Sequence, residues 1–191
     1  MTQFGFFLSR WFLLVFIFIL KQGQRVQIYL VIFPILSEDF LEINSLFDKK
    51  LSVFAFTFLA LILGGLSSSN TADDIWYQEL TKSSLNPPGY VFWIVWPILY
   101  LFMSISAYRA FENIYKIFFV QLFFNTIWSW LFFAFHLPVI ALLDIWLLIF
   151  LNIKITIVLF RTDRISTFLY IPYVLWLCFA SYLNLFIVIN N

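Results

Sequence analysis

Residues 139–160 read VIALLDIWLLIFLNIKITIVLF, and this stretch decides the fold. Only Asp144 and Lys154 place a charge in the otherwise apolar run. As a helix the segment is about 33 Å long, which is enough to cross a hydrocarbon core about 30 Å thick. A strand of a membrane barrel would alternate polar and apolar residues, and this run is continuous. The segment therefore predicts a transmembrane helix.

Four more apolar segments of this kind lie between residue 49 and residue 191. They cover residues 51–66, 90–107, 117–135 and 167–189, and Pro87 and Pro88 stand before the second of them. Proline suits the first turn of a helix because the N–H group there has no intrahelical partner. The sequence thus predicts an all-α integral membrane protein, a bundle of five transmembrane helices that occupies residues 49–191.

The composition of the chain supports a membrane protein. Of the 191 residues, 63% are hydrophobic and 11% are charged, against about 45–50% and about 25% in an average soluble domain. So few charged side chains cannot cover a soluble globule, which excludes a soluble enzyme, a nucleic-acid-binding protein and a disordered tail. Cys178 is the one cysteine and His136 the one histidine, so we expect no metal site.

Basic residues lie almost entirely on one side of the predicted spans. That side carries Lys49, Lys50, Arg109, Lys116, Arg161 and Arg164, and the other side carries Lys82 alone. Cytoplasmic loops of membrane proteins have an excess of lysine and arginine. We therefore expect a multi-pass protein with residue 49 on the cytoplasmic side and the C-terminus outside.

Residues 1–48 fall outside this five-helix pattern and are an N-terminal extension of unknown role. Residues 4–20 are mostly apolar and are followed by Lys21 and Arg25. The segment fits a sixth membrane helix with its N-terminus outside, an interfacial helix or a poor secretion signal. No small-residue cleavage site follows it, which argues against its removal.

One connection between the predicted spans is long. Residues 67–86 exceed the usual connection of about 4–6 residues and contain Trp76 and Tyr77. Long loops in compact proteins are often lids or binding elements. Tryptophan and tyrosine are also common as anchors at the membrane interface. A lid and an interfacial anchor both remain open for this loop.

Polar and aromatic residues share a stripe on the third and on the fifth predicted helix. The stripes recur at helical spacing and consist of Gln121, Asn125, Trp128 and Phe132, and of Tyr173, Trp176, Ala180 and Asn184. Such stripes describe the wall of a cavity that could stack a flat ligand. Amides in membrane helices also form interhelical hydrogen bonds, worth about 0.6 kcal/mol each. We favour the interhelical role for Asn125 and Asn184, and leave both roles open for Trp128 and Trp176.

Two titratable residues are candidates for chemistry. Asp144 lies about five residues into the fourth span, where an ionisable side chain is by default a functional candidate. Its position near a helix N-terminus also stabilises negative charge without any function. His136, in the short loop before that span, is a candidate haem ligand, although a lone loop histidine is usually just solvated. The sequence contains no nucleotide-binding loop, no nucleophile–histidine–acid set and no metal-spaced cluster.

Four motifs resemble those of a known family. Residues 76–100, WYQELTKSSLNPPGYVFWIVWPILY, resemble the WYxxLxKPxxxPPxxVFxxVWxxLY signature of the TspO/MBR family, the tryptophan-rich sensory or translocator proteins. Residues 121–133, QLFFNTIWSWLFF, are similar to the third-helix pattern of that family. Residues 141–144 and 172–184 resemble its fourth and fifth helices. The resemblance covers residues 49–191 and not residues 1–48.

The resemblance implies a five-helix bundle, often a homodimer, that binds porphyrins, haem and related planar hydrophobic ligands beneath its first loop. It implies no required cofactor besides such a ligand, and a role in tetrapyrrole homeostasis, sensing or transport. With the stripes, it gives as candidate ligand-binding residues Trp76, Pro87, Pro88, Tyr90, Asn125, Trp128, Asp144, Tyr173, Trp176, Ala180 and Asn184. Expected partners are thus a tetrapyrrole, the lipid bilayer and a second copy of the chain.

Two alternatives follow from the same resemblance. Some bacterial members are reported to break down protoporphyrin in light, and Trp176 would take part in such a reaction. Tyr90 stands where the family often has one of the tryptophans associated with that breakdown. A transporter or regulatory membrane subunit for another lipophilic ligand is the second alternative.

The end of the fifth span lacks the sterol motif of animal members. That motif requires a basic residue after a tyrosine, and no lysine or arginine follows Tyr182. We therefore expect no sterol recognition by this route, and a bacterial cell membrane is favoured.

Overall fold

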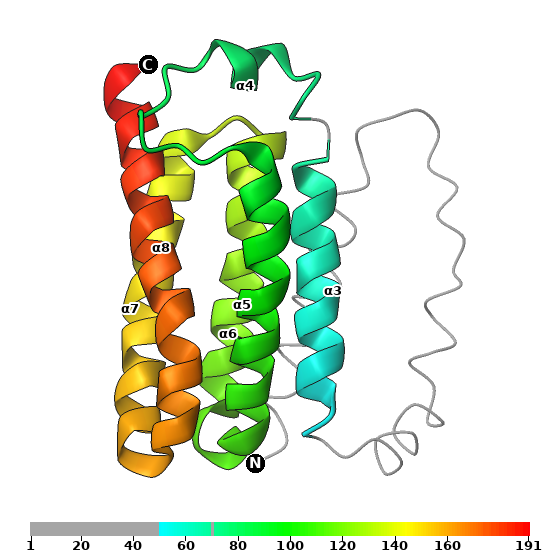
Figure 1. The fold of residues 1–191 in the computed structure, drawn as a ribbon, viewed down its shortest axis with the longest axis vertical. Coiled ribbons are helices and arrows are strands. Elements are labelled where there is room, and N and C mark those ends of the chain that lie inside the picture. The colour runs from blue at the N-terminus through cyan, green and yellow to red at the C-terminus, as the bar shows by residue number, and fades with distance from the viewer. Residues whose placement is uncertain (1–49, 70) are drawn as a thin grey trace, which may run out of the picture. The chain divides into compact units, whose positions relative to one another are not determined.

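The computed structural model describes residues 50–69 and 71–191, and the N-terminal extension lies outside them. Five long helices run side by side and alternate in direction (Figure 1). They are α3 (Ser52–Ser67), α5 (Gly89–Arg109), α6 (Phe111–Ser129), α7 (Pro138–Thr162) and α8 (Arg164–Asn190). The described residues contain no strand. The predicted all-α bundle is confirmed, and the three interpretations of residues 4–20 stay predictions.

Four of these helices are long and apolar enough to cross a membrane. They are α5, α7, α8 and the combined span Phe111–Ala134, with 21, 25, 27 and 24 residues. Helix α3 is apolar but has only 16 residues, about 24 Å of helix. The chain is therefore a multi-pass integral membrane protein.

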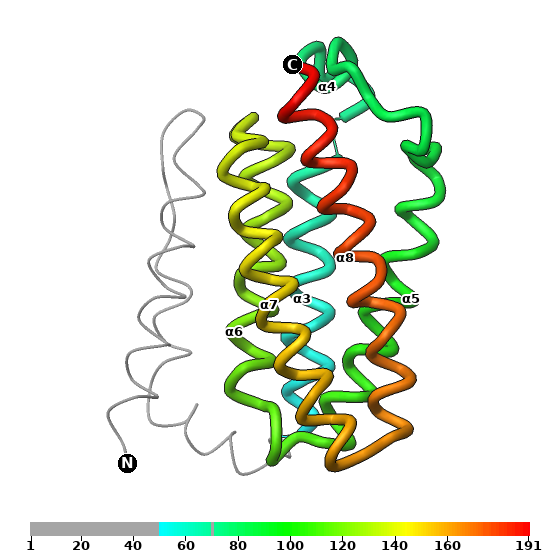
Figure 2. Tube along the Cα trace, turned by 90° about the vertical axis from the view of Figure 1, so that its left-hand side faces the viewer, coloured from blue at the N-terminus to red at the C-terminus, as the bar shows by residue number. Residues whose placement is uncertain are grey.

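The five long helices close into a ring. Each one packs mainly on two neighbours, in the order α3, α5, α8, α7, α6 and back to α3. Figure 2, turned by 90° from Figure 1, shows α7 and α8 as one such pair. Side chains on the inner faces of the five helices therefore lie around one common interior.

Two connections at one end of the ring are a single residue long. Ala110 joins α5 to α6, and Asp163 joins α7 to α8. Helix α6 consequently begins six residues before the predicted residue 117. Glu112 and Lys116 are exposed on its first turns, because a membrane helix can continue beyond the hydrocarbon core. We call this end of the ring the Asp163 end.

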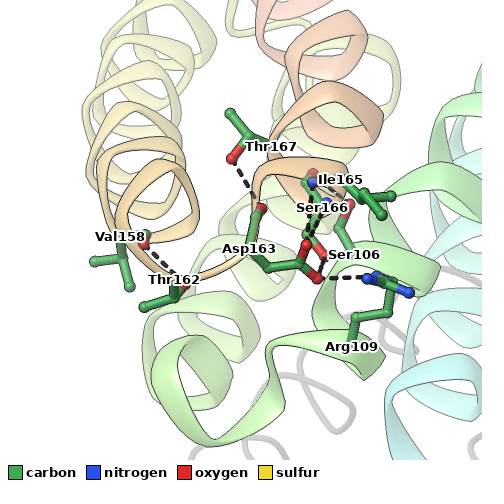
Figure 3. Close-up of polar contacts among 8 residues, drawn as sticks. All are labelled: Ser106, Arg109, Val158, Thr162, Asp163, Ile165, Ser166 and Thr167. Atoms are coloured by element: carbon green, nitrogen blue, oxygen red, sulfur yellow. Dashed lines mark hydrogen bonds and ion pairs between the residues drawn. The ribbon is translucent and has the colours of Figure 1, made fainter.

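The Asp163 side chain fastens the α7–α8 connection to the end of α5 (Figure 3). Its Oδ2 atom accepts hydrogen bonds from Arg109 Nε at 2.9 Å and from Ser166 Oγ at 2.8 Å. Its Oδ1 atom caps α8 by accepting from the backbone N–H groups of Ile165 and Ser166. Ser106 on α5 donates from Oγ to the Ser166 carbonyl at 2.8 Å. The bond from Arg109, followed by that from Ser166, lowers the pKa of Asp163 to about 2.

The opposite end of the ring carries the long connection that the sequence predicts. It contains a short helix, α4 (Ile75–Glu79), which lies across that end close to the C-terminus (Figures 1 and 2). Asp74 caps α4 by accepting from the Tyr77 N–H. We call residues 71–88 the lid segment and this end of the ring the lid end.

The third span changes helix type before it reaches the lid end. After Ser129 the chain continues as a π-helix, η2 (Trp130–Ala134). The Trp130 indole N–H donates to the Leu63 carbonyl on α3 at 3.1 Å. A π-helix places one more residue in each turn, and such segments are frequent at functional sites. Here Phe132 contacts Trp76, and Phe133 contacts Tyr77, so two consecutive rings both meet the lid segment.

Candidate ligand-binding site

A chain of buried polar side chains crosses the interior between four helices. Asn125 on α6 donates from Nδ2 to the Tyr173 hydroxyl on α8 at 2.8 Å, and its Oδ1 accepts from the Tyr100 hydroxyl on α5. The Tyr173 hydroxyl in turn donates to Gln121 Oε1 at 3.0 Å. Asn125 thus has the interhelical bonds that its sequence position favoured, and its contact with a ligand stays a prediction.

The same chain continues toward the Asp163 end. Asn152 on α7 donates from Nδ2 to Gln121 Oε1 at 3.3 Å, and Tyr170 on α8 donates to Asn152 Oδ1 at 2.6 Å. These three side chains are completely buried. Because each of these polar groups has a partner, the layer offers no free polar atom to a ligand. We call this layer of paired side chains the floor.

Asn184 also joins two helices. With its amide oriented so that both ends have partners, it donates to the Pro138 carbonyl and accepts from the Leu142 N–H, each at 3.0 Å. Pro138 and Leu142 form the first turn of α7. Asn184 therefore fixes α8 against the start of α7, the role favoured for it from the sequence.

Three tryptophans lie about one helical turn above this floor, toward the lid end. Trp128 follows Asn125 by three residues on α6, and Trp176 follows Tyr173 by three residues on α8. At 1.5 Å per residue, each is about 4.5 Å nearer the lid end than its floor residue. Trp96 precedes Tyr100 by four residues on α5, which runs the other way, and so rises by about 6 Å.

Asp144 reaches the same level from α7. It precedes Asn152 by eight residues, a rise of about 12 Å, while Asn125 is about 6 Å above Gln121, the partner of Asn152. Asp144 therefore lies about 6 Å above Asn125 along the bundle. Ala180, four residues after Trp176, is buried and keeps that part of α8 small.

The tryptophans of this level belong to two aromatic groups. Trp176 meets Phe92 and Trp96 of α5 edge to face, with ring centroids 5.8 Å and 6.3 Å apart. On the other side, Trp128 stacks on Phe132 at 5.6 Å with planes inclined by 18°. Large flat surfaces from α5, α6 and α8 are thus gathered at one level.

Three buried polar atoms of this level have no hydrogen-bond partner among the residues that the structure describes. They are the indole Nε1 atoms of Trp128 and Trp176 and the Oδ2 atom of Asp144. More than 90% of buried polar groups in proteins are hydrogen-bonded, and an unsatisfied one costs about 1–3 kcal/mol. Two donors and one acceptor without partners make this level the candidate ligand-binding site.

The lid segment approaches this level through Trp76. Its ring stacks on His136 with centroids 4.2 Å apart and meets Phe132 edge to face at 5.9 Å. His136 Nε2 lies 2.9 Å from Asp74 Oδ2. Trp76 is thereby linked through Phe132 to Trp128. Coordination of a haem iron by His136 Nε2 would require breaking its contact with Asp74.

The other half of the lid segment is attached to α8. Ser83 Oγ lies 3.0 Å from the Tyr182 hydroxyl, and Asn191 Oδ1 accepts from the Thr81 N–H at 2.8 Å. Between the two attachments, Lys82 places its ammonium group 4.3 Å from the centre of the Tyr77 ring. Burial lowers the pKa of Lys82 and raises that of Tyr77.

Some candidate residues lie away from the tryptophan level. Tyr90, on the first turn of α5, has 67% of its surface exposed, and Pro88 beside it is exposed as well. Pro87 is half-buried in the lid segment. Tyr90 is not among the aromatic rings that Trp128 and Trp176 contact within the described residues.

Two residues of the tryptophan level were not on the list of candidates. Phe92 and Trp96 both contact Trp176, and with Tyr100 they recur every four residues along α5. That spacing marks one face of a helix and could have identified them. No three His, Cys, Asp or Glu side chains converge as a metal site requires within residues 50–69 and 71–191.

The ring of helices, its aromatic level and the lid together define a class: a polytopic helical membrane protein with a tryptophan-rich interior. Residues 53–189 match the model of the TspO/MBR family, and the chain belongs to that family.

Several known proteins are similar to this chain over more than half of its length. Protein CrtK of Rhodobacter capsulatus is 34% identical over 145 residues, which are 71% of this chain and 90% of CrtK. The tryptophan-rich protein TspO of Archaeoglobus fulgidus is 33% identical over 150 residues, 74% of this chain and 97% of that protein. A tryptophan-rich sensory protein of Cereibacter sphaeroides is 32% identical over 117 residues, 58% of this chain and 73% of its own. The family assignment made from the motifs is confirmed.

Proposed function

We propose that this protein binds a planar tetrapyrrole, a porphyrin or haem, at the level of Trp96, Trp128 and Trp176, and serves in tetrapyrrole sensing or homeostasis. The observation that carries the proposal is a set of three buried atoms that have no partner within residues 50–69 and 71–191: Trp128 Nε1, Trp176 Nε1 and Asp144 Oδ2. The names of its relatives, which include a tryptophan-rich sensory protein, support a sensing role.

The chemistry of the level suits such a ligand. When a macrocycle stacks on tryptophan rings, apolar surface is removed from water, and this burial favours binding by about 25 cal/mol per Å². Indole N–H groups donate to acceptors at the rim of the ligand, such as carboxylate or carbonyl oxygens. The Asp144 carboxylate is an acceptor for N–H groups of the ligand. Propionate groups would point toward the lid end, where polar side chains and water are within reach.

The direct test is a titration of protoporphyrin IX into the detergent-solubilised protein in the dark, followed by tryptophan fluorescence and by the Soret band. We expect saturable quenching, with an affinity at least tenfold weaker in Trp176→Ala and Trp128→Ala. The matched control is Trp93→Ala, because Trp93 is 72% exposed on the outer face of α5 and should not matter. Absence of saturable binding, or equal losses in all three variants, would overturn the proposal.

Light-dependent breakdown of the porphyrin is the second candidate. It is favoured by the edge-to-face contact of Trp176 with Trp96, 6.3 Å between centroids, which places a second indole beside the one that would contact the ligand. Illumination of the same complex in air should then bleach the Soret band, and Trp176→Phe should slow the bleaching. A complex that keeps its spectrum under light leaves binding as the function.

A further inference from the structure

The lid segment has a titratable attachment to the body of the protein. His136 precedes α7, and its ring stacks on Trp76 with planes inclined by 15° while its Nε2 lies 2.9 Å from Asp74 Oδ2. Asp74 also caps α4, the helix that carries Trp76. One imidazole thus contacts both the start of α4 and its main aromatic side chain.

The backbone at His136 is adapted to this contact. Its φ of 54° lies in the left-handed region, and no other non-glycine residue of the described ranges has a positive φ. This conformation is uncommon without glycine and is often retained where a side chain has to be aimed. The unfavourable backbone conformation thus occurs at the residue whose ring contacts the lid segment.

The charges around His136 are mostly negative. On the lid segment they are Asp73, Asp74, Glu79 and Lys82, and Lys82 is engaged with Tyr77 through its ring and its carbonyl. Tyr77, Tyr90 and Tyr182 are the other titratable side chains of this end, and α7 contributes only Asp144, eight residues away. A protonated imidazole is therefore attracted by Asp74 and by the face of Trp76, whereas a neutral one loses both electrostatic attractions.

We propose that His136 is a positioning residue for the lid segment, whose protonation holds Trp76 against Phe132 and so closes the site at Trp128. The inference rests on the proposed ligand site for its consequence, slower ligand exchange at mildly acidic pH. The fraction of open lid should change by roughly threefold to tenfold, which is about 0.7–1.4 kcal/mol and is what a weak exposed ion pair and a cation–π contact supply together.

The first test uses the ligand-free protein. We expect amide hydrogen exchange across residues 74–80, after correction for its intrinsic pH dependence, to be threefold to tenfold faster at pH 8 than at pH 5.5. His136→Phe keeps a ring for Trp76 without a charge, and Asp74→Asn keeps the cap without a charge. Both should remove the pH response. Asp73→Asn, an exposed carboxylate one residue away, is the control that should keep it.

The second test measures the dissociation rate of protoporphyrin IX at the two pH values. The dissociation rate constant of the unmodified protein, divided by that of His136→Phe, should be smaller at pH 5.5 than at pH 8. Taking this ratio cancels the effect of the porphyrin's own titration. If porphyrin fails to bind while the lid still shows its pH response, the ligand proposal falls and the positioning role stands. If lid exchange has no pH response, or Asp73→Asn removes it as Asp74→Asn does, the role of His136 is overturned.

Discussion

Asn125 on α6 and Tyr173 on α8 share a hydrogen bond of 2.8 Å at the centre of the helix ring, directly below the level of the tryptophans. The bond divides the interior into two layers with different tasks. Below it the side chains of Gln121, Asn152 and Tyr170 are paired with one another or with Tyr173 and Met103, and above it three polar atoms have no partner among the described residues. Substitutions in the two layers should therefore have opposite consequences for stability and for binding.

The paired layer should be sensitive to loss of Asn125. In Asn125→Ala the hydroxyls of Tyr100 and Tyr173 both lose a partner, which should lower the free energy of unfolding by about 1–3 kcal/mol. Unfolding in mixed detergent and SDS micelles measures the change. Asn113→Ala, an exposed amide on the same helix, is the control. An unchanged stability would mean that the tyrosines find other partners.

The unpaired layer should respond in the opposite sense. Asp144→Leu removes a buried oxygen without a partner, so the ligand-free protein should gain about 1–3 kcal/mol in unfolding free energy. The affinity for protoporphyrin IX should fall in the same variant. The two numbers come from an unfolding titration and a fluorescence titration. A loss of both stability and affinity would show that Asp144 has a structural task.

The Asp163 end should show an acid-dependent stability. Because the pKa of Asp163 is lowered to about 2, its contribution is complete above the ordinary aspartate range and is lost as the pH falls from about 4 to about 2. Arg109→Ala removes the main cause and should move this loss to higher pH. Thermal unfolding between pH 2 and 6 measures the shift; superimposable profiles of the two proteins would contradict it.

The α8 attachment of the lid segment depends on one hydroxyl. Tyr182→Phe removes the contact with Ser83 Oγ and should speed hydrogen exchange over residues 81–86. The association and dissociation rates of protoporphyrin IX should both rise, with a small change in affinity. Tyr108→Phe, on α5 near the Asp163 end, is the control. Lid exchange that ignores both substitutions would show that Asn191 alone fixes this half of the segment.

The orientation in the membrane is open to a direct test. The starts of α3, α6 and α8 lie together at the Asp163 end, and with them the described basic residues Lys50, Arg109, Lys116, Arg161 and Arg164. The positive-inside rule then predicts the C-terminus, beside the lid segment, outside the cytoplasm. Alkaline phosphatase fused after Asn191 should be active and a fluorescent protein dark. The reverse result would place the lid segment in the cytoplasm.

The spans could be predicted because membrane crossing leaves a strong and simple signal. A continuous apolar run admits only a helix, so all five long helices were located, and Pro87 and Pro88 marked the start of α5. Helix α6 was predicted too short, since the hydrophobic run ends where the membrane ends and the helix does not. The π-helix η2 left no signal, because its register depends on packing against α3 and the lid segment.

The candidate site was predicted in part for a similar reason. Helical spacing places Asn125 and Trp128, or Tyr173 and Trp176, on one face, and the structure puts both pairs inside the ring. Spacing says nothing of partners between helices, so it could not decide which amides are already paired. It also could not join Asp74 to His136, which are 62 residues apart in the sequence.

The single-residue connections Ala110 and Asp163 have a mechanical consequence for any cargo. They join α5 to α6 and α7 to α8 at one end of the ring, and the bond between Arg109 and Asp163 links these two connections. The other end is spanned by the long lid segment. A molecule that passed straight through the ring would have to separate the helices that these two connections hold together. We therefore expect a ligand of the tryptophan level to enter and leave beneath the lid segment or sideways between helices, and not through the Asp163 end.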